Sequence, residues 1–435
     1  MSGSRLVCAG CGWHADPGAA RPYRCARAGD GGDHVLEHRL GPGAVLDRAD
    51  DAHPFVRYRE SLFAWHAAQA RGVPDADFVA LVRRLDARIA EVDGHGFAPT
   101  PYRRAAALGE RLDVDLWIKD ETGNVAGSHK ARHLMGVLLH VEVEGIARDT
   151  PLAIASCGNA ALAAAVLARA ARRPLRVFVP PHAEPAVLDR LHALGAAVVA
   201  CPRAPGELGD PCVRGFHAAL AAGALPFCCQ GNENGLTIDG GETLVHEMLA
   251  AGAPAPEHLV IQVGGGALAS ACLQGVARAL AAGRLARAPR VHTVQTGGAA
   301  PLARAWARFE AHRASGRVPL DAALAFAAAH RDEFMWPWET PPASVAEGIL
   351  DDETYDWLAL VRGMAATGGS AAVVDEDTLL DANRLARDLA GIPASATGSA
   401  GLAGAMKLRR DGAIAPGARV AVVLSGVERA GAAPA

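Results

Sequence analysis

Short runs of consecutive apolar residues recur along this chain, and segments with helical spacing separate them. The clearest runs are "DLWIKD", "LAIAS", "LRVFVP", "HLVIQV" and "RVAVVLSG". Strands buried on both faces of a sheet form continuous apolar runs, and their alternation with helices is typical of a parallel sheet. We therefore predict an α/β fold with helices on both faces of the sheet. Ligands of such folds bind beside the carboxyl ends of the strands.

The same alternation extends through most of the chain. We expect further strands in "AAVVAC", "LPFCCQ" and "RVHTVQT". We expect helices over Phe78–Val92, 129–145, 157–171 and 264–280, where apolar residues follow a helical period.

Charge and cysteine content exclude several classes of protein. A net charge of −4 over 435 residues gives no support to a nucleic-acid or acidic-membrane partner. No window holds 18 uninterrupted apolar residues, and "MSGSRLVCAGCGW" lacks the apolar core and cleavage site of a signal peptide. Nine cysteines, an odd number with scattered spacing, indicate reduced thiols. We expect a cytoplasmic protein.

A glycine-rich loop, "VGGGALAS" (263–270), follows one of the apolar runs and opens a helix. Its backbone N–H groups can approach an anion closely, and the helix N-terminus adds a favourable dipole. The loop can be a tight turn only, or it can bind a phosphate. It also satisfies the dinucleotide pattern G-x-G-x-x-A, but the next strand ends in Gln295 and Thr296 instead of the acidic residue that a ribose requires. A phosphate is therefore favoured.

Lysine is rare in this chain. Of 43 basic Lys and Arg residues, only Lys119, Lys130 and Lys407 are lysines, and Lys130 lies in "GSHKARH". Lysine can lose its proton and form a Schiff base, which arginine cannot. A surface lysine on a helix is the plain alternative. Together with a phosphate loop, however, Lys130 suggests a phosphorylated aldehyde cofactor, pyridoxal 5′-phosphate (PLP).

A series of motifs between residues 99 and 429 resembles the fold-type II PLP enzymes, which include threonine synthases, serine/threonine ammonia-lyases and cysteine synthases. The motifs are "TPYRRAAALGERLDVDLWIKDET", "GSHKARH", "SCGNA", "GLTIDGGETLVHE", "VGGGAL", "SVAEGIL", "TGSAGLAGAMKL" and "LSGVER". The resemblance implies two doubly wound parallel-sheet domains of the tryptophan synthase β-like type, with a small N-terminal Cys-bearing extension. It also implies a homodimer.

The resemblance implies a division of the chain into three parts. Residues 1–45 would form the extension. Residues 46–245 would form a first catalytic half with the Schiff-base lysine and a movable substrate-binding subdomain. Residues 246–430 would form a second catalytic half with the phosphate loop.

Cofactor roles follow from the same resemblance. Lys130 would hold PLP as a Schiff base, and its amine, once an amino acid displaces it, would remove the Cα proton of the substrate. The phosphate would be bound by the N–H groups of Gly264, Gly265, Gly266, Ala267 and Leu268.

Asn159 would donate a hydrogen bond to the ring oxygen of the cofactor. The neutral loop Ser156-Cys157-Gly158-Asn159 precedes a helix, so its N–H groups can bind the substrate carboxylate. A helix cap is the plain alternative for this loop.

A hydroxyl is expected to meet the pyridine nitrogen. The resemblance assigns this position to Thr397, with Ser399 as a competitor, and a helix cap is the alternative for both. A hydroxyl leaves the ring nitrogen largely unprotonated, which favours rapid loss of a leaving group.

The predicted reaction is PLP-dependent elimination or replacement at the β or γ carbon of a small amino acid. Serine, threonine and an O-activated homologue are candidate substrates, and threonine-synthase-like and ammonia-lyase-like activities both stay open. The segment 332–357, rich in tryptophan and acidic residues, can line a substrate entrance. The alternatives are a nicotinamide-dependent oxidoreductase and a catalytically silent protein with the PLP fold.

Three cysteines near the N-terminus resemble half of a zinc knuckle. Cys8 and Cys11 have the C-x-x-C spacing, and Cys25 follows. A fourth ligand would have to come from His14, His34 or His38. With three cysteines, the pattern favours a metal-free remnant over bound zinc.

Overall fold

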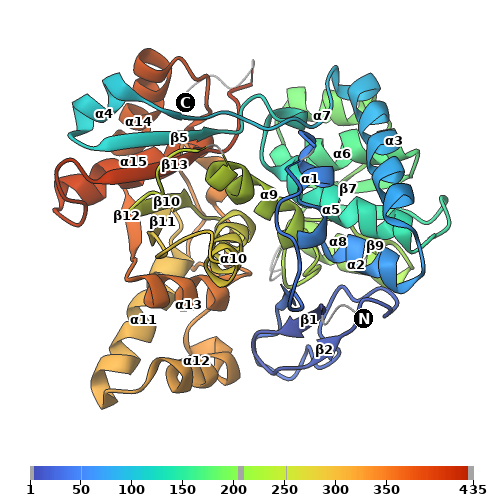
Figure 1. Cartoon of the computed structure of the whole chain (residues 1–435), viewed down its shortest axis with the longest axis horizontal. Coiled ribbons are helices and arrows are strands. Elements are labelled where there is room, and N and C mark those ends of the chain that lie inside the picture. The colour runs from blue at the N-terminus through green and yellow to red at the C-terminus, as the bar shows by residue number, and fades with distance from the viewer. Residues whose placement is uncertain (1–3, 50, 204–209, 251, 430–435) are drawn as a thin grey trace.

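The computed structural model describes residues 4–49, 51–203, 210–250 and 252–429. Of the predicted division, residues 1–3 of the extension, residues 50 and 204–209 of the first half and residues 251 and 430 of the second half lie outside the described residues. Two sheet-and-helix layers stand side by side, and the N-terminal extension lies at their base (Figure 1). Among the described residues, no helix has both the length and the apolar character needed to cross a bilayer.

The larger sheet has six strands in the order β12-β11-β10-β13-β5-β4. Their bounds are Tyr102–Arg104 (β4), Asp115–Asp120 (β5), His258–Gln262 (β10), Arg290–Thr296 (β11), Ala371–Val374 (β12) and Arg419–Leu424 (β13). All neighbours pair in parallel except β4, which runs antiparallel to β5. All five residues of β10 are buried, as expected for a strand covered on both faces.

The smaller sheet has four parallel strands in the order β8-β7-β6-β9. Their bounds are Leu152–Ala155 (β6), Leu175–Val179 (β7), Ala197–Ala200 (β8) and Leu225–Pro226 (β9). The strand expected in "LPFCCQ" is thus only two residues long. It ends at Pro226, which has no N–H group to donate to a ladder.

Helices connect the strands. The bounds are α1 Pro54–Arg57, η1 Arg59–Ser61, α2 Phe63–Ala70, α3 Asp75–Asp93, α4 Ala106–Leu112, η2 Val125–Gly127, α5 Lys130–Val143, α6 Asn159–Ala171, α7 Pro185–Ala193, α8 Pro211–Ala221, α9 Thr237–Ala250, α10 Ala267–Ala281, α11 Pro301–Gly316, α12 Leu320–Ala329, η3 Arg331–Glu333, η4 Glu347–Ile349, α13 Trp357–Thr367, α14 Glu376–Ala390 and α15 Ala396–Arg410. The helices expected over 78–92, 129–145, 157–171 and 264–280 correspond to α3, α5, α6 and α10.

Alternate residues of the six-stranded sheet enter two separate cores. Val260 and Val422 pack with residues of α14 and α15 on one face. Leu259, Ile261 and Val423 pack with residues of α10 and α13 on the other. The sheet is therefore covered on both sides, as the apolar runs predicted.

Strands β4 and β5 belong to the six-stranded sheet, although they precede the whole four-stranded sheet in the chain. The division at residues 45 and 245 stays a prediction about domains. The contact between α5 and α9 is very close, because a Cβ at Gly240 would lie 2.0 Å from the carbonyl oxygen of Arg132. This contact fixes α5, and with it Lys130.

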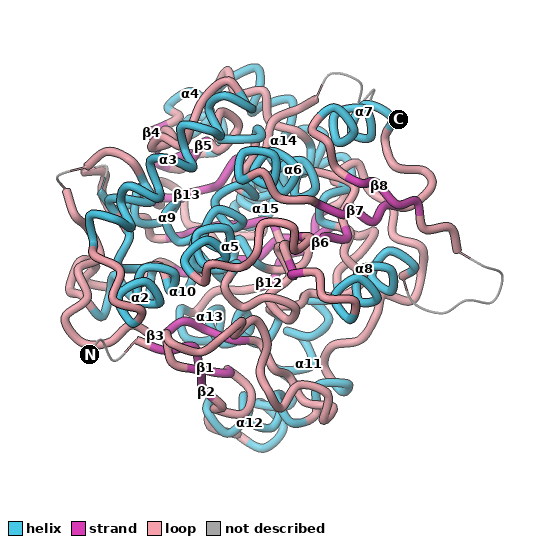
Figure 2. Tube along the Cα trace, turned by 90° about the vertical axis from the view of Figure 1, so that its right-hand side faces the viewer, coloured by secondary structure: helices cyan, strands magenta, loops and turns pink. Residues whose placement is uncertain are grey.

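The N-terminal extension contains a small antiparallel sheet in the order β2-β1-β3, formed by Arg5–Cys8 (β1), His14–Ala15 (β2) and Leu36–Arg39 (β3). In the view of Figure 2, these strands lie beside α12 and α13. The sequence analysis did not predict this sheet, because its strands are only two to four residues long.

Candidate active site

Lys130 is the first residue of α5 and follows the loop that leaves the carboxyl end of β5. The neighbouring strand β13 ends beside it. The N–H of His129 donates to the carbonyl oxygen of Ser425 at 3.0 Å, and Ser128 forms an isolated bridge with Gly426. The lysine is therefore held where two parallel strands end, as predicted for a ligand site in this fold.

The amine of Lys130 makes no hydrogen bond or ion pair with any residue that the structure describes, and the side chain is half-buried. Its charge nevertheless acts on two carboxyls, those of the half-buried Asp351 and the buried Asp356. An unpaired amine in a partly closed site is available for covalent chemistry.

The predicted carboxylate-binding loop connects β6 to α6. Gly158 precedes the helix, and no side chain in the described part of the chain caps the first turn of α6, so its N–H groups stay available. Ser156 Oγ lies 3.5 Å from the N–H of Gly158, and Cys157 is exposed. The arrangement fits an anion at the start of the helix.

Asn159 begins α6, and its side chain lies next to the loop of Ser425 and Gly426. A Cβ at Gly426 would lie 2.9 Å from Asn159 Nδ2 and 3.4 Å from Ser128 Cβ. The opposite end of the amide, Oδ1, accepts hydrogen bonds from Arg429 at 2.9 and 3.3 Å. Nδ2 therefore points into the region of Lys130 and is free to donate, as the cofactor ring oxygen would require.

The glycine loop Gly264–Gly266 joins β10 to α10. Gly266 has a φ of 106°, which side chains rarely adopt, and no side chain caps α10. The carbonyl of Gly264 accepts from Thr354 Oγ1 at 2.9 Å, and that of Gly265 accepts from the N–H of Asp356 at 3.2 Å. The segment around residue 355 thus holds the loop by its carbonyls and leaves the first N–H groups of α10, including those of Ala267 and Leu268, uncapped.

Two acids border this loop, the half-buried Asp351 and the buried Asp356. A Cβ at Gly264 would lie 2.2 Å from Asp351 Oδ2, and one at Gly266 would lie 3.0 Å from Asp356 Cβ. Burial raises the pKa of Asp351 to about 6, against the Lys130 charge and the Gly265 backbone. Burial, with the neighbouring Asp33, raises the pKa of Asp356 to about 8.

These residues fit a phosphorylated aldehyde. Neither carboxylate oxygen of Asp356 has a hydrogen-bond partner among the described residues, and the same is true of Ser128 Oγ. The carboxyl group of Asp351 already lies against the glycine loop, in a position that suits an anion. Neutral carboxyls, which burial favours here, can share the loop with a phosphate, whereas ionised ones would repel it.

The hydroxyl predicted for the ring nitrogen has two candidates. Thr397 lies in the first turn of α15, where its Oγ1 accepts from the N–H of Gly348 at 2.9 Å. Ser425, at the carboxyl end of β13, accepts from Gln262 Nε2 at 2.6 Å, and its proton is available to a further acceptor. Ser425 was not predicted from the sequence as a site residue, although a hydroxyl directly after an apolar strand in "LSGVER" was a usable signal. Ser399 lies inside α15 and donates to the carbonyl of Ser395 at 3.0 Å, one turn earlier, whereas the helix cap is Ser395 itself, which accepts from the N–H of Gly398.

Four charged residues of the motifs quoted above form a buried ionic network near Lys130: Lys119, Glu121, Arg132 and Glu247. Arg132 donates to Glu121 at 2.8 Å and to Glu247 at 2.7 Å. Lys119 donates to Glu247 at 2.5 Å and to the carbonyl of Thr100 at 2.8 Å. All these charges are compensated, so the network supports the site and has no free group for chemistry.

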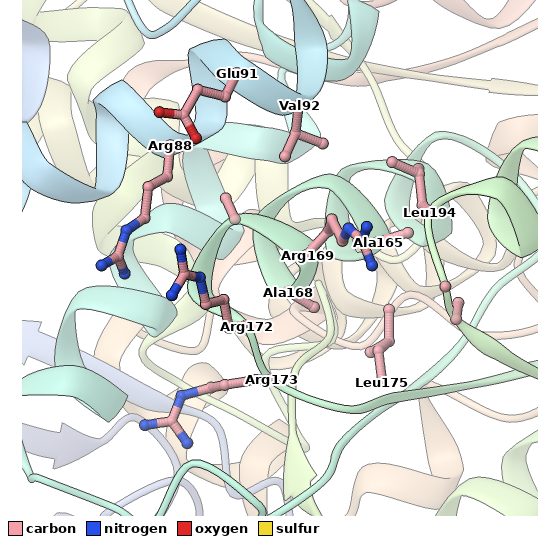
Figure 3. A pocket seen from close by; sticks show the side chains of 13 residues that line it. Arg88, Glu91, Val92, Ala165, Ala168, Arg169, Arg172, Arg173, Leu175 and Leu194 are labelled. Atoms are coloured by element: carbon pink, nitrogen blue, oxygen red, sulfur yellow. The ribbon is translucent and has the colours of Figure 1, made fainter.

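A cavity of about 510 Å³ lies elsewhere, between α3, α6 and the segment that leads into β8. Figure 3 shows Arg88 and Arg172 pointing to one side of it and Arg169 to the other. None of the predicted site residues lines this cavity.

A free lysine at the carboxyl ends of parallel strands, beside a glycine loop with uncapped amides, defines an enzyme that holds a phosphorylated cofactor on a lysine. Residues 95–426 match the family described as "Pyridoxal-phosphate dependent enzyme", and the chain belongs to this family. Its cofactor is pyridoxal 5′-phosphate, as predicted. The family assignment replaces the nicotinamide interpretation of the glycine loop.

Relatives lie among lyases and synthases. The chain is 27% identical to L-serine dehydratase/L-threonine deaminase of Mus musculus over 177 residues, which are 41% of this chain and 52% of the relative. It is 24% identical to threonine synthase of Bacillus sp. (strain ULM1) over 330 residues, or 75% of this chain and 82% of the relative. The chain thus spans about half the length of the mouse relative.

A solved structure confirms the fold class. Maize serine racemase superposes with a TM-score of 0.59 at 18% sequence identity, covering 80% of this chain and 92% of the racemase. The predicted fold-type II architecture is therefore correct.

Proposed function

We propose that the protein eliminates the β-substituent of a small hydroxy-amino acid, such as serine or threonine, and releases a keto acid and ammonia. The observation that carries this proposal is the unpaired amine of Lys130 at the carboxyl ends of β5 and β13, together with two helices, α6 and α10, that no side chain of the described residues caps. One N-terminus suits the cofactor phosphate and the other suits the carboxylate of an amino acid.

Each group has a separate task. PLP, when bound, supplies an electron sink for charge at the substrate Cα. Lys130 Nζ removes the Cα proton, since a freed amine beside the substrate is a competent base. The N–H groups of Gly158 and Asn159 orient the carboxylate, and Nδ2 of Asn159 donates to the ring oxygen.

We assign the hydroxyl at the ring nitrogen to Ser425 in preference to Thr397. Ser425 follows β13 directly, and its carbonyl is bonded to the residue before Lys130. Gln262 donates to Ser425 Oγ, which leaves the hydroxyl proton for the ring nitrogen. A hydroxyl donor would leave the ring nitrogen unprotonated, which favours prompt loss of the β-hydroxyl. Lys130 Nζ would return to that hydroxyl the proton that it took from Cα, so that the group leaves as water. Water is then consumed when ammonia is released.

Replacement in place of hydrolysis is a second candidate. The match to a threonine synthase extends over 82% of that relative, a longer stretch than the match to the mouse dehydratase. In that case a second nucleophile would capture the unsaturated product of an O-activated amino acid.

The test is a screen of the PLP-loaded protein with serine, threonine and O-activated homologues. Keto acid and ammonia should appear in equal amounts with a hydroxy-amino acid, and Lys130→Ala should produce neither. A new amino acid with release of the activating group would support replacement, and loss of optical purity alone would support racemisation. Bound PLP with no turnover of any amino acid would contradict the proposal and favour a catalytically silent protein.

A homodimer and a cytoplasmic location are further parts of this proposal. Light scattering of the purified protein tests the first, and fractionation of cells that express it tests the second.

A further inference from the structure

The N-terminal extension brings four metal-ligand atoms together. The thiols of Cys8, Cys11 and Cys25 and a ring nitrogen of His34 all lie within 4.8 Å of one another. Cys11 Sγ is 3.6 Å from Cys25 Sγ, and Cys8 Sγ is 3.5 Å from His34 Nδ1. A disulfide requires about 2.05 Å between sulfurs, so these thiols are not joined.

The separations of 3.5 and 3.6 Å match the edges of a zinc tetrahedron. With Zn–S bonds of about 2.3 Å and Zn–N bonds of about 2.0–2.1 Å, neighbouring ligand atoms lie about 3.5–3.8 Å apart. Four protein ligands close the coordination sphere, which is the pattern of a structural site and not of a catalytic one.

The backbone between the first two cysteines is shaped as a knuckle. The N–H of Gly12 donates to the carbonyl of Cys8 at 3.0 Å, and Gly12 has a φ of 72°. A Cβ at Gly10 would lie 1.8 Å from the carbonyl oxygen of Asp33. Gly12 permits the left-handed conformation of the turn, and Gly10 lets the loop lie tightly against Asp33, next to His34.

The structure selects one of the three candidate histidines. His34 directs Nδ1 toward Cys8, and its Nε2 lies 2.7 Å from Asp30 Oδ1. A carboxylate on the second ring nitrogen orients histidine ligands of zinc. His38 instead bonds Asp239 at 2.9 Å, and His14 is outside the cluster.

We propose that Cys8, Cys11, Cys25 and His34 bind one structural zinc ion, and that this ion holds the extension as a brace between the two halves of the molecule. The proposal departs from the preference for a metal-free remnant that the sequence favoured, and it does not depend on which reaction the protein catalyses.

The N-terminal extension forms hydrogen bonds with two separate parts of the molecule. On one side, the N–H of Gly235 donates to the carbonyl of Tyr23 at 2.9 Å, and the N–H of Arg21 donates to Glu144 at 2.8 Å. On the other, Trp357 Nε1 donates to Asp33 Oδ1 at 2.9 Å. Trp357 follows Asp356, whose N–H holds the glycine loop. A metal that fixes residues 8–34 therefore also supports the wall of the cofactor site.

Metal analysis of the full-length wild-type protein, prepared under reducing conditions with zinc supplied, tests the site. We expect one zinc per chain, loss of zinc in His34→Ala, and retention in His14→Ala, a matched histidine on the same extension. In the wild type, cobalt should replace zinc and give the intense visible bands of tetrahedral thiolate coordination. This measurement does not depend on whether a variant folds. Far less than one zinc per chain, or a cobalt spectrum without thiolate ligands, would overturn the proposal.

Hydrogen exchange tests the brace separately from the reaction. On zinc removal, amide exchange should rise in residues 5–39 and also in residues 328–335 and 354–364, while α3 stays protected. A rise confined to residues 5–39 would leave the metal site in place but refute the brace.

Discussion

Arg429 holds the side-chain amide of Asn159 in one orientation, with its Nη2 and Nε donating to Asn159 Oδ1 at 2.9 and 3.3 Å. Arginine has no acceptor, so the oxygen of the amide must face it. The same guanidinium donates to the carbonyl of Ala126 at 2.7 Å, in the turn that precedes Lys130. Arg429 thus ties the amide expected at the cofactor ring oxygen to the loop of the lysine.

Replacing Arg429 with Met should release this amide. Hydrogen bonds to charged groups contribute about 1.5–3 kcal/mol, so turnover should fall by roughly 10- to 100-fold. The visible spectrum of the bound cofactor should shift as well, which a merely structural loss would not produce. Arg410→Met, at the exposed end of α15, is the control. An unchanged spectrum would show that Arg429 does not position Asn159.

Lys130→Ala should remove the covalently bound cofactor and its visible absorption. Loss of a positioned proton-transfer group costs about 10²–10⁴-fold in rate, and loss of the covalent link adds to this. Lys407→Ala is the matched control, because Lys407 forms only an exposed ion pair with Asp411 at 2.7 Å. Equal losses of absorption and activity in the two variants would show that Lys130 is not the lysine that binds the cofactor.

Arg132→Met should destabilise the protein strongly. The substitution leaves the buried carboxylates of Glu121 and Glu247 with one cation fewer, and breaking a buried pair in this way costs about 3–5 kcal/mol. Denaturant unfolding measures the loss. Arg384→Met, which breaks exposed pairs on α14, should show no comparable effect. A small loss of free energy of unfolding in Arg132→Met would mean that water enters the site and solvates the carboxylates of Glu121 and Glu247.

Asp356→Asn should reduce the pH dependence of stability. The pKa of Asp356 is raised from 3.8 to about 8 in the folded protein, so folding favours its neutral form. The contribution of Asp356 to the free energy of unfolding is therefore complete below pH 4 and is lost as the pH rises through about 8. The wild type should therefore melt at a lower temperature at pH 9 than at pH 6.

In Asp356→Asn the difference between these two pH values should shrink, because an amide does not ionise. Asp381→Asn, on the exposed face of α14, is the control. Affinity for PLP should also fall above pH 8 in the wild type, since an ionised Asp356 would repel the phosphate. The same dependence of melting temperature on pH in wild type and Asp356→Asn would show that Asp356 does not cause the pH dependence of stability.

Much of this architecture follows from local sequence. β5 and β10 can be predicted from their own apolar residues, without knowing which strands pair with them. The rarity of lysine drew attention to Lys130. β4 was not predicted, because "YRR" at the edge of the sheet carries no apolar pattern. β12, "AAVV", was also missed, because it is short and rich in alanine.

Residues whose roles depend on distant neighbours could not be assigned in this way. Ser425 matters because β13 ends next to His129, 296 residues earlier in the chain. Arg429 and Asn159 are 270 residues apart. His34 could be chosen over His14 and His38 only after the knuckle had been placed in space.

The position of β5 has a consequence for biosynthesis. β5 lies between β4 and β13, and Asp115 and Arg419, which pair across β5 and β13, are 304 residues apart. A nascent chain therefore exposes one edge of β5, including Ile118, until most of the polypeptide has left the ribosome. Such long-range pairing is slow and prone to aggregation. Production of this protein should depend on chaperones that cover this strand edge during translation.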